Sequence, residues 1–439
     1  MENELRASRR IQAAWCFFDW ANSAFPTVIV TFVFSTYFIT SVAPNHVEGT
    51  TLWGYAVSAS ALLIALVSPF VGAISDAGGR KKPWLAFFSL VCVLCTALLW
   101  YIKPDPDLII WGLCLFVLAN FAFEVGTVFY NAMLPQITPP ANIGRLSGWG
   151  WGLGYAGGLC CLAFVLLGFV QPERPFLGLQ KETAEHIRVI GPLVAVWFVV
   201  FSAPLFIFVS DRKTKSQCLA NSAKEGFLRL VQTIKLLKLS GTIPQFLIAR
   251  LFYVDGLNTL FAFAGVYAAG SFGMGMDEII IFGIVLNMMA GLGAIAFSWL
   301  DDLLGPKKVV LISLVVIFLL ILPLLIIESK IMFWALGLVL GIFVGPAQAA
   351  SRSLMVRLAP ANQISEMFGM FAFSGKITAF LCPLVLATVT ALFGSQRIGM
   401  VAIVIFLGVG ACILTMVKEP PLNEPDQNEK INAESVLHP

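Results

Sequence analysis

Charged side chains are scarce in this chain, and their scarcity excludes an ordinary soluble fold. Asp, Glu, Lys and Arg make up 12% of the 439 residues, whereas 58% are hydrophobic. A soluble domain carries about 25% charged residues. The net charge of +3 is small and no stretch is dense in Lys or Arg, so we expect no nucleic-acid partner. This composition is typical of a protein that crosses a membrane several times.

Histidine is almost absent, and the cysteines form no recognisable site. His46, His186 and His438 lie outside the long apolar segments, which argues against a histidine proton relay or metal site within a membrane. Most of the nine cysteines lie inside apolar segments, and we interpret Cys92 and Cys95 as small hydrophobic residues. Because the sequence shows no metal cluster and no nucleophile–base constellation, we expect neither a cofactor nor an enzyme.

Long apolar segments are what the sequence has instead. A helix needs about 20 apolar residues to cross the hydrocarbon core of a bilayer, and twelve segments meet this requirement. Their expected limits are 16–41, 51–75, 84–102, 108–133, 145–170, 189–209, 243–269, 278–300, 308–327, 332–356, 366–392 and 398–417. We therefore predict an all-α membrane protein with twelve transmembrane helices, in a first six-helix bundle over 16–209 and a second over 243–417.

The distribution of positive charge predicts the orientation. If the N-terminal residues 1–15 lie inside, 20 of the 28 Lys and Arg residues fall on the cytoplasmic side, six on the opposite side and two within spans. This asymmetry places both termini in the cytoplasm. The charged start runs into a span too long for a signal peptide. The chain has no Asn-x-Ser/Thr sequon, which favours a bacterial source and the inner (plasma) membrane.

Two polar segments complete the domain plan. The central loop 210–242 separates the spans six and six, and in its second part apolar residues recur at helical spacing with basic residues between them. This pattern predicts an amphipathic helix on the cytoplasmic face. Residues 418–439 are polar and rich in Pro at their start, and we expect a disordered cytoplasmic tail.

The two halves of the chain repeat each other. Residues 17–25 and 253–261 share one pattern, an aromatic residue followed by Asp-x-x-Asn, a hydroxyl residue and Phe. The tripeptide Pro-Ala-Asn also recurs, at 140–142 and 360–362. Landmarks that recur in the same order indicate two six-helix halves related by a pseudo-two-fold axis, as in many secondary transporters.

Charged residues within the spans are few, and their positions follow the repeat. They are Asp19, Glu124, Arg250, Asp255 and Lys376, with Arg352 near the cytoplasmic end of its span. Five of these six lie on the first, fourth, seventh and tenth spans, which occupy equivalent positions in a nested three-helix repeat. We therefore expect these four helices to line a central cavity, with the eleventh beside it.

The acidic and amide residues each have two interpretations. We expect Asp19 and Asp255 to face the cavity, because a carboxylate exposed to lipid is costly, although they could instead cap polar clusters that fix helix packing. Asn22 and Asn258 lie one helical turn further on, and each could contact a solute or bond between helices. Glu124 sits among apolar residues, a setting that suits a proton carrier or an ion-pair partner equally.

The basic residues are expected to find partners on other helices. Arg250 lies five positions before Asp255, about 140° round the helix, so the two should not pair with each other. Lys376 is followed by apolar residues and is too deep to reach the surface; it should pair with a carboxylate or with an anionic group of the solute. Arg352 could extend to the headgroups, and Gln348 is a further polar candidate.

Several motifs resemble one transporter family. Residues 72–81, Gly72-x-x-x-Asp76-x-x-Gly79-Arg80-Lys81, resemble the cytoplasmic loop signature of the major facilitator superfamily. Residues 18–25 look like the first-helix signature of its Unknown Major Facilitator branch, which contains vacuolar amino-acid effluxers and many bacterial relatives. Segments 129–135, 154–158, 351–353 and 374–376 resemble that branch too. The resemblance covers nearly all twelve spans and implies the facilitator fold, alternating access and solute transport, without fixing the solute.

The resemblance also implies a cytoplasmic gate that holds the two halves together. Its residues would be Asp76, Arg80, Lys81, Asp302 and Lys307. The second loop departs from the family pattern, since Ser298 replaces the glycine and Pro306 stands where the arginine would be. Its part in gating is therefore open.

Charges of both signs in one cavity suit a zwitterion, which one carboxylate and one cation could hold. We predict secondary active or facilitative transport of a small polar solute, an amino acid or similar zwitterion, by a monomer in the lipid bilayer. Coupling to a proton through one of the carboxylates is an additional hypothesis. Export of hydrophobic compounds is the alternative, as is a non-transporting sensor or scaffold on the same fold.

Overall fold

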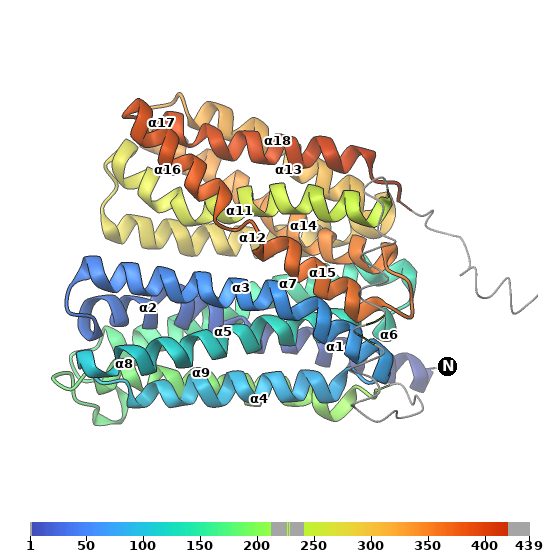
Figure 1. Ribbon diagram of the computed structural model, residues 1–439, viewed down its shortest axis with the longest axis horizontal. Helices are drawn as coiled ribbons and strands as arrows, with labels where there is room; N and C mark the ends of the chain where they lie inside the picture. Colours follow the sequence, from blue (N-terminus) through green and yellow to red (C-terminus); the bar gives the residue numbers. More distant parts are fainter. Residues whose placement is uncertain (1, 212–225, 227, 229–240, 420–439) are drawn as a thin grey trace, which may run out of the picture.

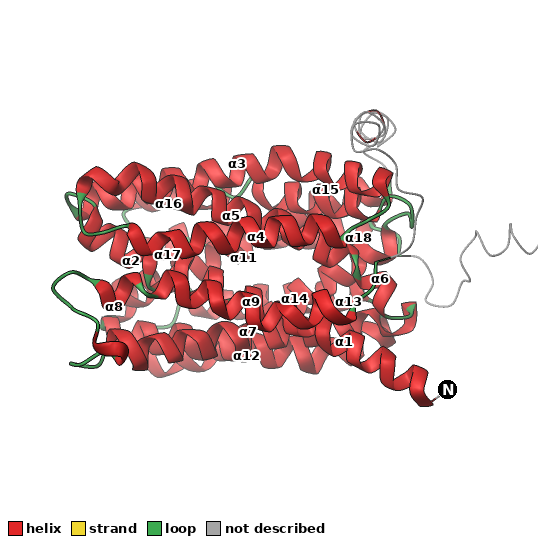
Figure 2. Ribbon diagram, turned by 90° about the horizontal axis from the view of Figure 1, so that it is seen from below, coloured by secondary structure: helices red, strands yellow, loops and turns green. Residues whose placement is uncertain are grey.

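The computed structural model is a long bundle of helices and describes residues 2–211, 226, 228 and 241–419 (Figure 1). No strand occurs among these residues. The helices run roughly along one direction, and the connecting loops collect at the two ends of the bundle (Figure 2). The amphipathic helix expected in 210–242 and the tail expected at 418–439 fall almost wholly outside the described residues.

The first half contains the first six spans. The first span begins with α1 (Glu2–Asn22) and continues through two π-helical segments, Phe25–Phe32 and Phe38–Val42, on either side of the short α2 (Phe34–Tyr37). The other five spans are built on α3 (His46–Gly78), α4 (Lys82–Leu98), α5 (Ile109–Ala132), α7 (Ile143–Val165) and α9 (Ile190–Phe208). The short helices α6 (Leu134–Ile137) and α8 (Glu185–Arg188) lie between them.

The second half contains the other six. Its long helices are α11 (Thr242–Phe272), α12 (Met276–Leu304), α13 (Pro306–Leu324), α14 (Lys330–Leu358) and α18 (Val401–Met416), with the short α17 (Gln396–Gly399) before α18. The remaining span is broken into α15 (Ile364–Lys376) and α16 (Leu381–Phe393).

Twelve segments of the described chain are long and apolar enough to cross a membrane, which confirms the predicted fold class. Helices often extend beyond the apolar runs that predicted them. The second span starts at His46 rather than 51, because the Asn45 side chain accepts a hydrogen bond from the Glu48 backbone N–H at 2.9 Å and caps a polar first turn. The eleventh span, expected as one helix over 366–392, is interrupted at 377–380.

The two ends of the bundle differ in how the halves meet. We call the end where α1 begins and α18 ends the terminal face, and the opposite end the distal face (Figure 1). At the terminal face α3 packs along α15, and α7 packs along α12. A Cβ on Gly72 would lie 2.3 Å from the Ser365 carbonyl oxygen, and one on Gly148 2.4 Å from that of Ala294. The halves are therefore in backbone contact there.

Toward the distal face the halves separate. The distal part of the broken helix, α16, does not share the packing of α15 against α3. The described structure is thus closed at its terminal face.

Candidate functional site

A cavity of about 440 Å³ lies between the two halves. Its wall comes from α1, α5 and α7 of the first half and from α11, α14 and α15 of the second. These are the first, fourth, seventh and tenth spans expected from the buried charges, with the eleventh beside them and the fifth in addition. Its charged lining residues are Asp19, Glu124, Arg250, Arg352 and Lys376.

The innermost ion pair joins Asp19 to Arg352. The Arg352 Nη1 lies 3.0 Å from the Asp19 Oδ2, and the two side chains are only 4% and 13% exposed. Arg352 also donates to the Ser147 hydroxyl at 2.9 Å and to the Ser147 carbonyl at 2.6 Å, and its guanidinium lies 4.8 Å from the centre of the Trp15 ring. All of these partners belong to the first half, so the donors of this arginine tie α14 of the second half to the first.

Glycine makes room for this pair. A Cβ on Gly150 would lie 2.6 Å from the Asp19 Oδ2 and 2.9 Å from the Arg352 Nη2. Any larger residue on this turn of α7 would displace one member of the pair. The sequence alone indicated that Arg352 could extend to the headgroups, but its side chain is buried in the wall of the cavity instead.

A second ion pair joins the halves nearer the open side. The Lys376 Nζ lies 2.6 Å from the Glu124 Oε1, and the side chains are 28% and 24% exposed. Lys376 is the last residue of α15, at the break in the eleventh span. Since this pair is partly accessible from the cavity, a solute could compete for either partner.

Arg250 is a cavity cation of a different kind. It donates to the Ser374 hydroxyl at 2.9 Å and to the Phe371 carbonyl, and its guanidinium lies 3.4 Å from the centre of the Phe371 ring. In the described part of the chain it forms no ion pair with a carboxylate. The cavity therefore has three cations against two carboxylates, and both carboxylates are already paired.

The two copies of the Asp-x-x-Asn pattern do not face the cavity alike. Asp19 lines it, as do Asn22 and Asn258. Asp255 does not: it is 2% exposed, and its Oδ2 accepts a hydrogen bond from the backbone N–H of Cys382 at 2.9 Å. The difference arises because the eleventh span is broken, so that the first turn of α16 offers a free N–H that no continuous helix would have.

The remaining polar candidate also bridges the halves. The Gln348 side-chain oxygen accepts a hydrogen bond from the Tyr155 hydroxyl at 2.7 Å. Gln348 lies on α14, and Tyr155 lies on α7, five residues beyond the Gly150 that accommodates the Asp19 pair. This contact closes the wall of the cavity between the fifth and tenth spans.

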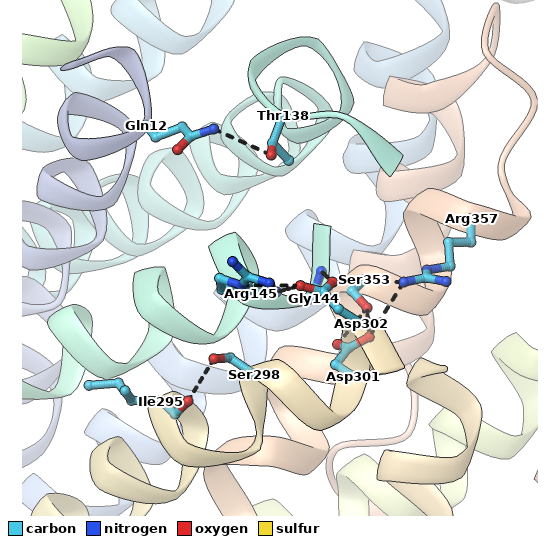
Figure 3. Close-up of polar contacts among 10 residues, drawn as sticks. All are labelled: Gln12, Thr138, Gly144, Arg145, Ile295, Ser298, Asp301, Asp302, Ser353 and Arg357. Carbon is cyan, nitrogen blue, oxygen red and sulfur yellow. Dashed lines mark hydrogen bonds and ion pairs between the residues drawn. The ribbon is translucent and has the colours of Figure 1, made fainter. Parts of the chain in front are cut away.

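At the terminal face, two aspartates bridge the halves through backbone N–H groups. The Asp76 Oδ2 accepts from the Glu366 N–H at 2.8 Å, at the start of α15. The Asp302 carboxylate accepts from Gly144 at 2.8 Å and from Arg145 at 3.1 Å, at the start of α7 (Figure 3). A carboxylate is a good acceptor for a helix N-terminus. Each half therefore caps a helix of the other, in equivalent positions.

The basic residues of the two loops do not bridge the halves through the contacts that the structure records. Arg80 is exposed. The Lys81 Nζ donates to the Ala132 carbonyl at 3.0 Å, and the Lys307 Nζ donates to the Thr415 carbonyl at 2.8 Å, each within its own half. Lysines beside helix C-terminal carbonyls are well placed electrostatically, so these two fix the loops that carry the aspartates.

Neighbours of Asp302 were not foreseen from the sequence. Asp301 accepts hydrogen bonds from the Ser353 hydroxyl at 2.7 and 2.9 Å, and Arg357 lies 3.9 Å from Asp301 and 4.0 Å from Asp302 (Figure 3). The contact of Ser147 with Arg352 was not predicted from the sequence either. The recurrence of small and hydroxyl residues around Arg352, at 351–353, was the one available signal. In the described chain, no group of three or more His, Cys, Asp or Glu could hold a metal.

Comparison with known proteins places this geometry in a family. The family model described as "Vacuole effluxer Atg22 like" matches residues 39–144 and 141–420. The chain is 26% identical over 422 residues to the uncharacterized MFS-type transporter YxiO of Bacillus subtilis, covering 95% of this chain and 96% of that protein. It is 24% identical to autophagy-related protein 22 of Kluyveromyces lactis, covering 81% and 77%.

Solved structures show the same fold. The proton:xylose symporter XylE, a major facilitator superfamily protein, superposes with a TM-score of 0.74 over 97% of this chain and 99% of XylE, at 11% sequence identity. This likeness establishes the arrangement of the twelve helices.

Proposed function

This chain belongs to the Atg22-like vacuole effluxer family, a branch of the major facilitator superfamily, and on that premise we propose that it transports a small zwitterion such as an amino acid. The fold and the relatives are those of transporters, not of enzymes. The identity of the solute is our inference from the cavity.

The observation that carries the proposal is the imbalance of charge in the cavity. Asp19 and Glu124 each form an ion pair with a cation, whereas Arg250 forms no ion pair with a carboxylate of the described chain. Arginine is well suited to bind a carboxylate through two parallel hydrogen bonds. A solute carboxylate at Arg250 would complete the pairing, and the ammonium group of the same solute could displace Lys376 from Glu124.

The size and lining of the cavity favour a small polar solute over a large hydrophobic one. Its volume of about 440 Å³ is near the lower end of the range for ligand pockets. Phe123, Phe368 and Phe371 contribute apolar surface. A purely hydrophobic compound would nevertheless shield the Arg250 cation from water without supplying a carboxylate for it, which is costly.

Alternating access would expose this cavity to each side in turn. The structure is closed at its terminal face by the Asp76 and Asp302 caps and by the Asp19–Arg352 pair. Opening that face requires all three to break while the distal ends come together. Because most Lys and Arg residues lie on the terminal side, we assign this face to the cytoplasm, in the inner membrane of a bacterial cell. We further propose that a monomer performs the cycle, since one chain supplies the whole cavity wall.

A binding experiment tests the solute class. A ligand that binds only the folded state stabilises it by about 2.7 kcal/mol at one hundred times its Kd. We expect the purified protein to show a rise in Tm with at least one free amino acid, and no rise with the matching amino alcohol, which lacks the carboxylate. Arg250→Met should abolish the rise, whereas the matched variant Lys103→Met, at an exposed loop position, should keep it. Equal stabilisation by amino acid and amino alcohol would contradict the proposal.

A further inference from the structure

Asp255 is a buried carboxylate with one free oxygen. It lies on α11 and is 2% exposed. Its Oδ2 accepts the hydrogen bond from Cys382, but its Oδ1 is buried without a hydrogen-bond partner. In the described chain it forms no ion pair, in contrast with Asp19 and Glu124. An ionised carboxylate in a membrane interior needs a cation or several donors to offset its lost hydration, and Asp255 has one N–H.

The surroundings of Asp255 offer no charge to replace a missing cation. From α16 the Cys382 thiol faces it, and on its own helix the Thr259 hydroxyl donates to the Asp255 backbone carbonyl at 2.7 Å. From α18 the apolar residues Phe406 and Leu407 approach Gly256, the residue that follows Asp255. The cations of the neighbouring helices are engaged elsewhere: Lys376 with Glu124, Arg352 with Asp19, Lys330 with Glu278, Arg357 beside Asp301 and Asp302, Arg250 at Ser374 and Arg397 at the Ile326 carbonyl.

From this geometry we propose that Asp255 is a proton-binding site separate from the solute cavity, and that it couples transport to a proton. The coupling rests on the proposed transport function; the proton site does not. A proton from water adds to Oδ1 and gives a neutral carboxylic acid, and loss of the same proton to water on the other side restores the carboxylate. The neutral acid avoids the cost of burying a charge that no cation balances.

Because the eleventh span is broken, protonation of Asp255 can change how α16 is held. Asp255 holds the first turn of α16, while Lys376 at the end of α15 holds the other half through Glu124. Only 377–380 separate the two helices (Figure 1). An ionised Asp255 caps α16 strongly, and a neutral one caps it weakly. Protonation therefore changes how α16 is anchored to α11, one turn away from the Lys376–Glu124 pair.

The site is distinct from the place of the solute. Val254 and Leu257 on the same turn of α11 line the cavity, but the buried Asp255 between them does not. Neutralising Asp255 should thus leave solute binding and exchange intact and remove only the effect of the proton. Neutralising Glu124 or Asp19, which do line the cavity, should impair exchange itself.

Infrared difference spectroscopy tests the proton site without any solute. The full-length protein in lipid vesicles is titrated from alkaline to acidic pH, and the carbonyl stretch of protonated carboxyl groups is recorded. We expect an Asp255 band near neutral pH, where solvent-exposed carboxyls, with ordinary pKa values of about 4, are ionised, in addition to any band from other buried carboxyls such as Asp301. The band should be lost in Asp255→Asn, retained in the exposed-loop control Glu173→Gln and shifted in frequency in Asp255→Glu, which keeps a carboxyl if the amide variant fails to fold. A neutral-pH spectrum that is the same in native protein and Asp255→Glu, or that has no carboxyl band, overturns the site.

A transport measurement tests the coupling in the same vesicles. Exchange of labelled for unlabelled amino acids should persist in Asp255→Asn, while the stimulation of net uptake or release by an imposed pH gradient should fall to none. A pH gradient that drives Asp255→Asn as well as native protein overturns the coupling. If native protein exchanges no amino acid, the proposed solute is wrong. The infrared experiment then still tests whether Asp255 binds a proton, because it uses no solute.

Discussion

Asp76 near the end of α3 caps the first turn of α15 in the opposite half: its Oδ2 accepts a hydrogen bond from the backbone N–H of Glu366 at 2.8 Å. Asp302 makes the equivalent contact to Gly144 from the second half. In each loop a glycine three residues later has a positive φ, 72° at Gly79 and 91° at Gly305, so the chain turns away as soon as the carboxylate is in place. Two symmetric helix caps thus help to hold the terminal face closed.

Removing one cap should shift the balance between the two access states. A side-chain cap contributes about 1 kcal/mol to its helix, so Asp76→Ala should raise the population open at the terminal face about fivefold. Spin labels on Arg80→Cys and Asn362→Cys, in a chain freed of its native cysteines, would report the distance across this face. We expect a longer-distance population in Asp76→Ala, and the same distribution as in native protein would contradict the role of the cap.

The second loop should behave like the first despite its altered sequence. Asp302→Ala removes the carboxylate that accepts hydrogen bonds from two backbone N–H groups of α7. It also removes the carboxylate that pairs with Arg145 and Arg357. We expect it to open the terminal face at least as much as Asp76→Ala, with labels placed at Leu303 and Asn142.

The Asp19–Arg352 pair should show the asymmetry of buried ion pairs. Removing one partner leaves an uncompensated charge and costs about 3–5 kcal/mol, whereas removing both costs far less. We expect Arg352→Met to lower the Tm strongly and Asp19→Asn/Arg352→Met to recover most of that loss. Thermal unfolding of the purified single and double variants measures the difference. Additive losses in the double variant would show that the two side chains do not stabilise each other.

Gly150 should tolerate no side chain. Its Cβ would lie 2.6 Å from the Asp19 Oδ2, and overpacking a buried site costs about 1–3 kcal/mol. Gly150→Ala should therefore lower the Tm and impair transport. Gly54→Ala is the matched control, since nothing lies within 4 Å of a Cβ there, and it should keep native stability. A Gly150→Ala protein as stable as the Gly54→Ala protein would contradict the packing.

The sequence predicts the twelve spans well, because each consists of a long apolar run and the bilayer fixes the length of a crossing helix. It does not predict the break at 377–380. Pro383 was the signal: it lies in the first turn of α16, where its missing N–H costs nothing, and it cannot bond to a carbonyl of the preceding turn. The equivalent helix of the first half, α7, is continuous.

The sequence does not predict which buried cation pairs with which buried carboxylate. Asp19 and Arg352 are 333 positions apart, and only the packed halves decide which cation meets which carboxylate. The repeat relates residues 17–25 to 253–261, but the aspartates of the two similar segments have different neighbours. Asp19 meets Arg352 beside a glycine on a continuous helix, whereas Asp255 meets the free N–H created by the break.

The most direct test of the central claim is counterflow in proteoliposomes. Vesicles containing native protein are loaded with a mixture of unlabelled amino acids, and the labelled mixture is added outside. We predict transient accumulation of label by native protein and by the loop control Lys103→Met, and none by Arg250→Met, which lacks the cation available to the solute carboxylate. No accumulation by well-folded native protein, or equal accumulation by Arg250→Met, would contradict transport of a zwitterion through this cavity.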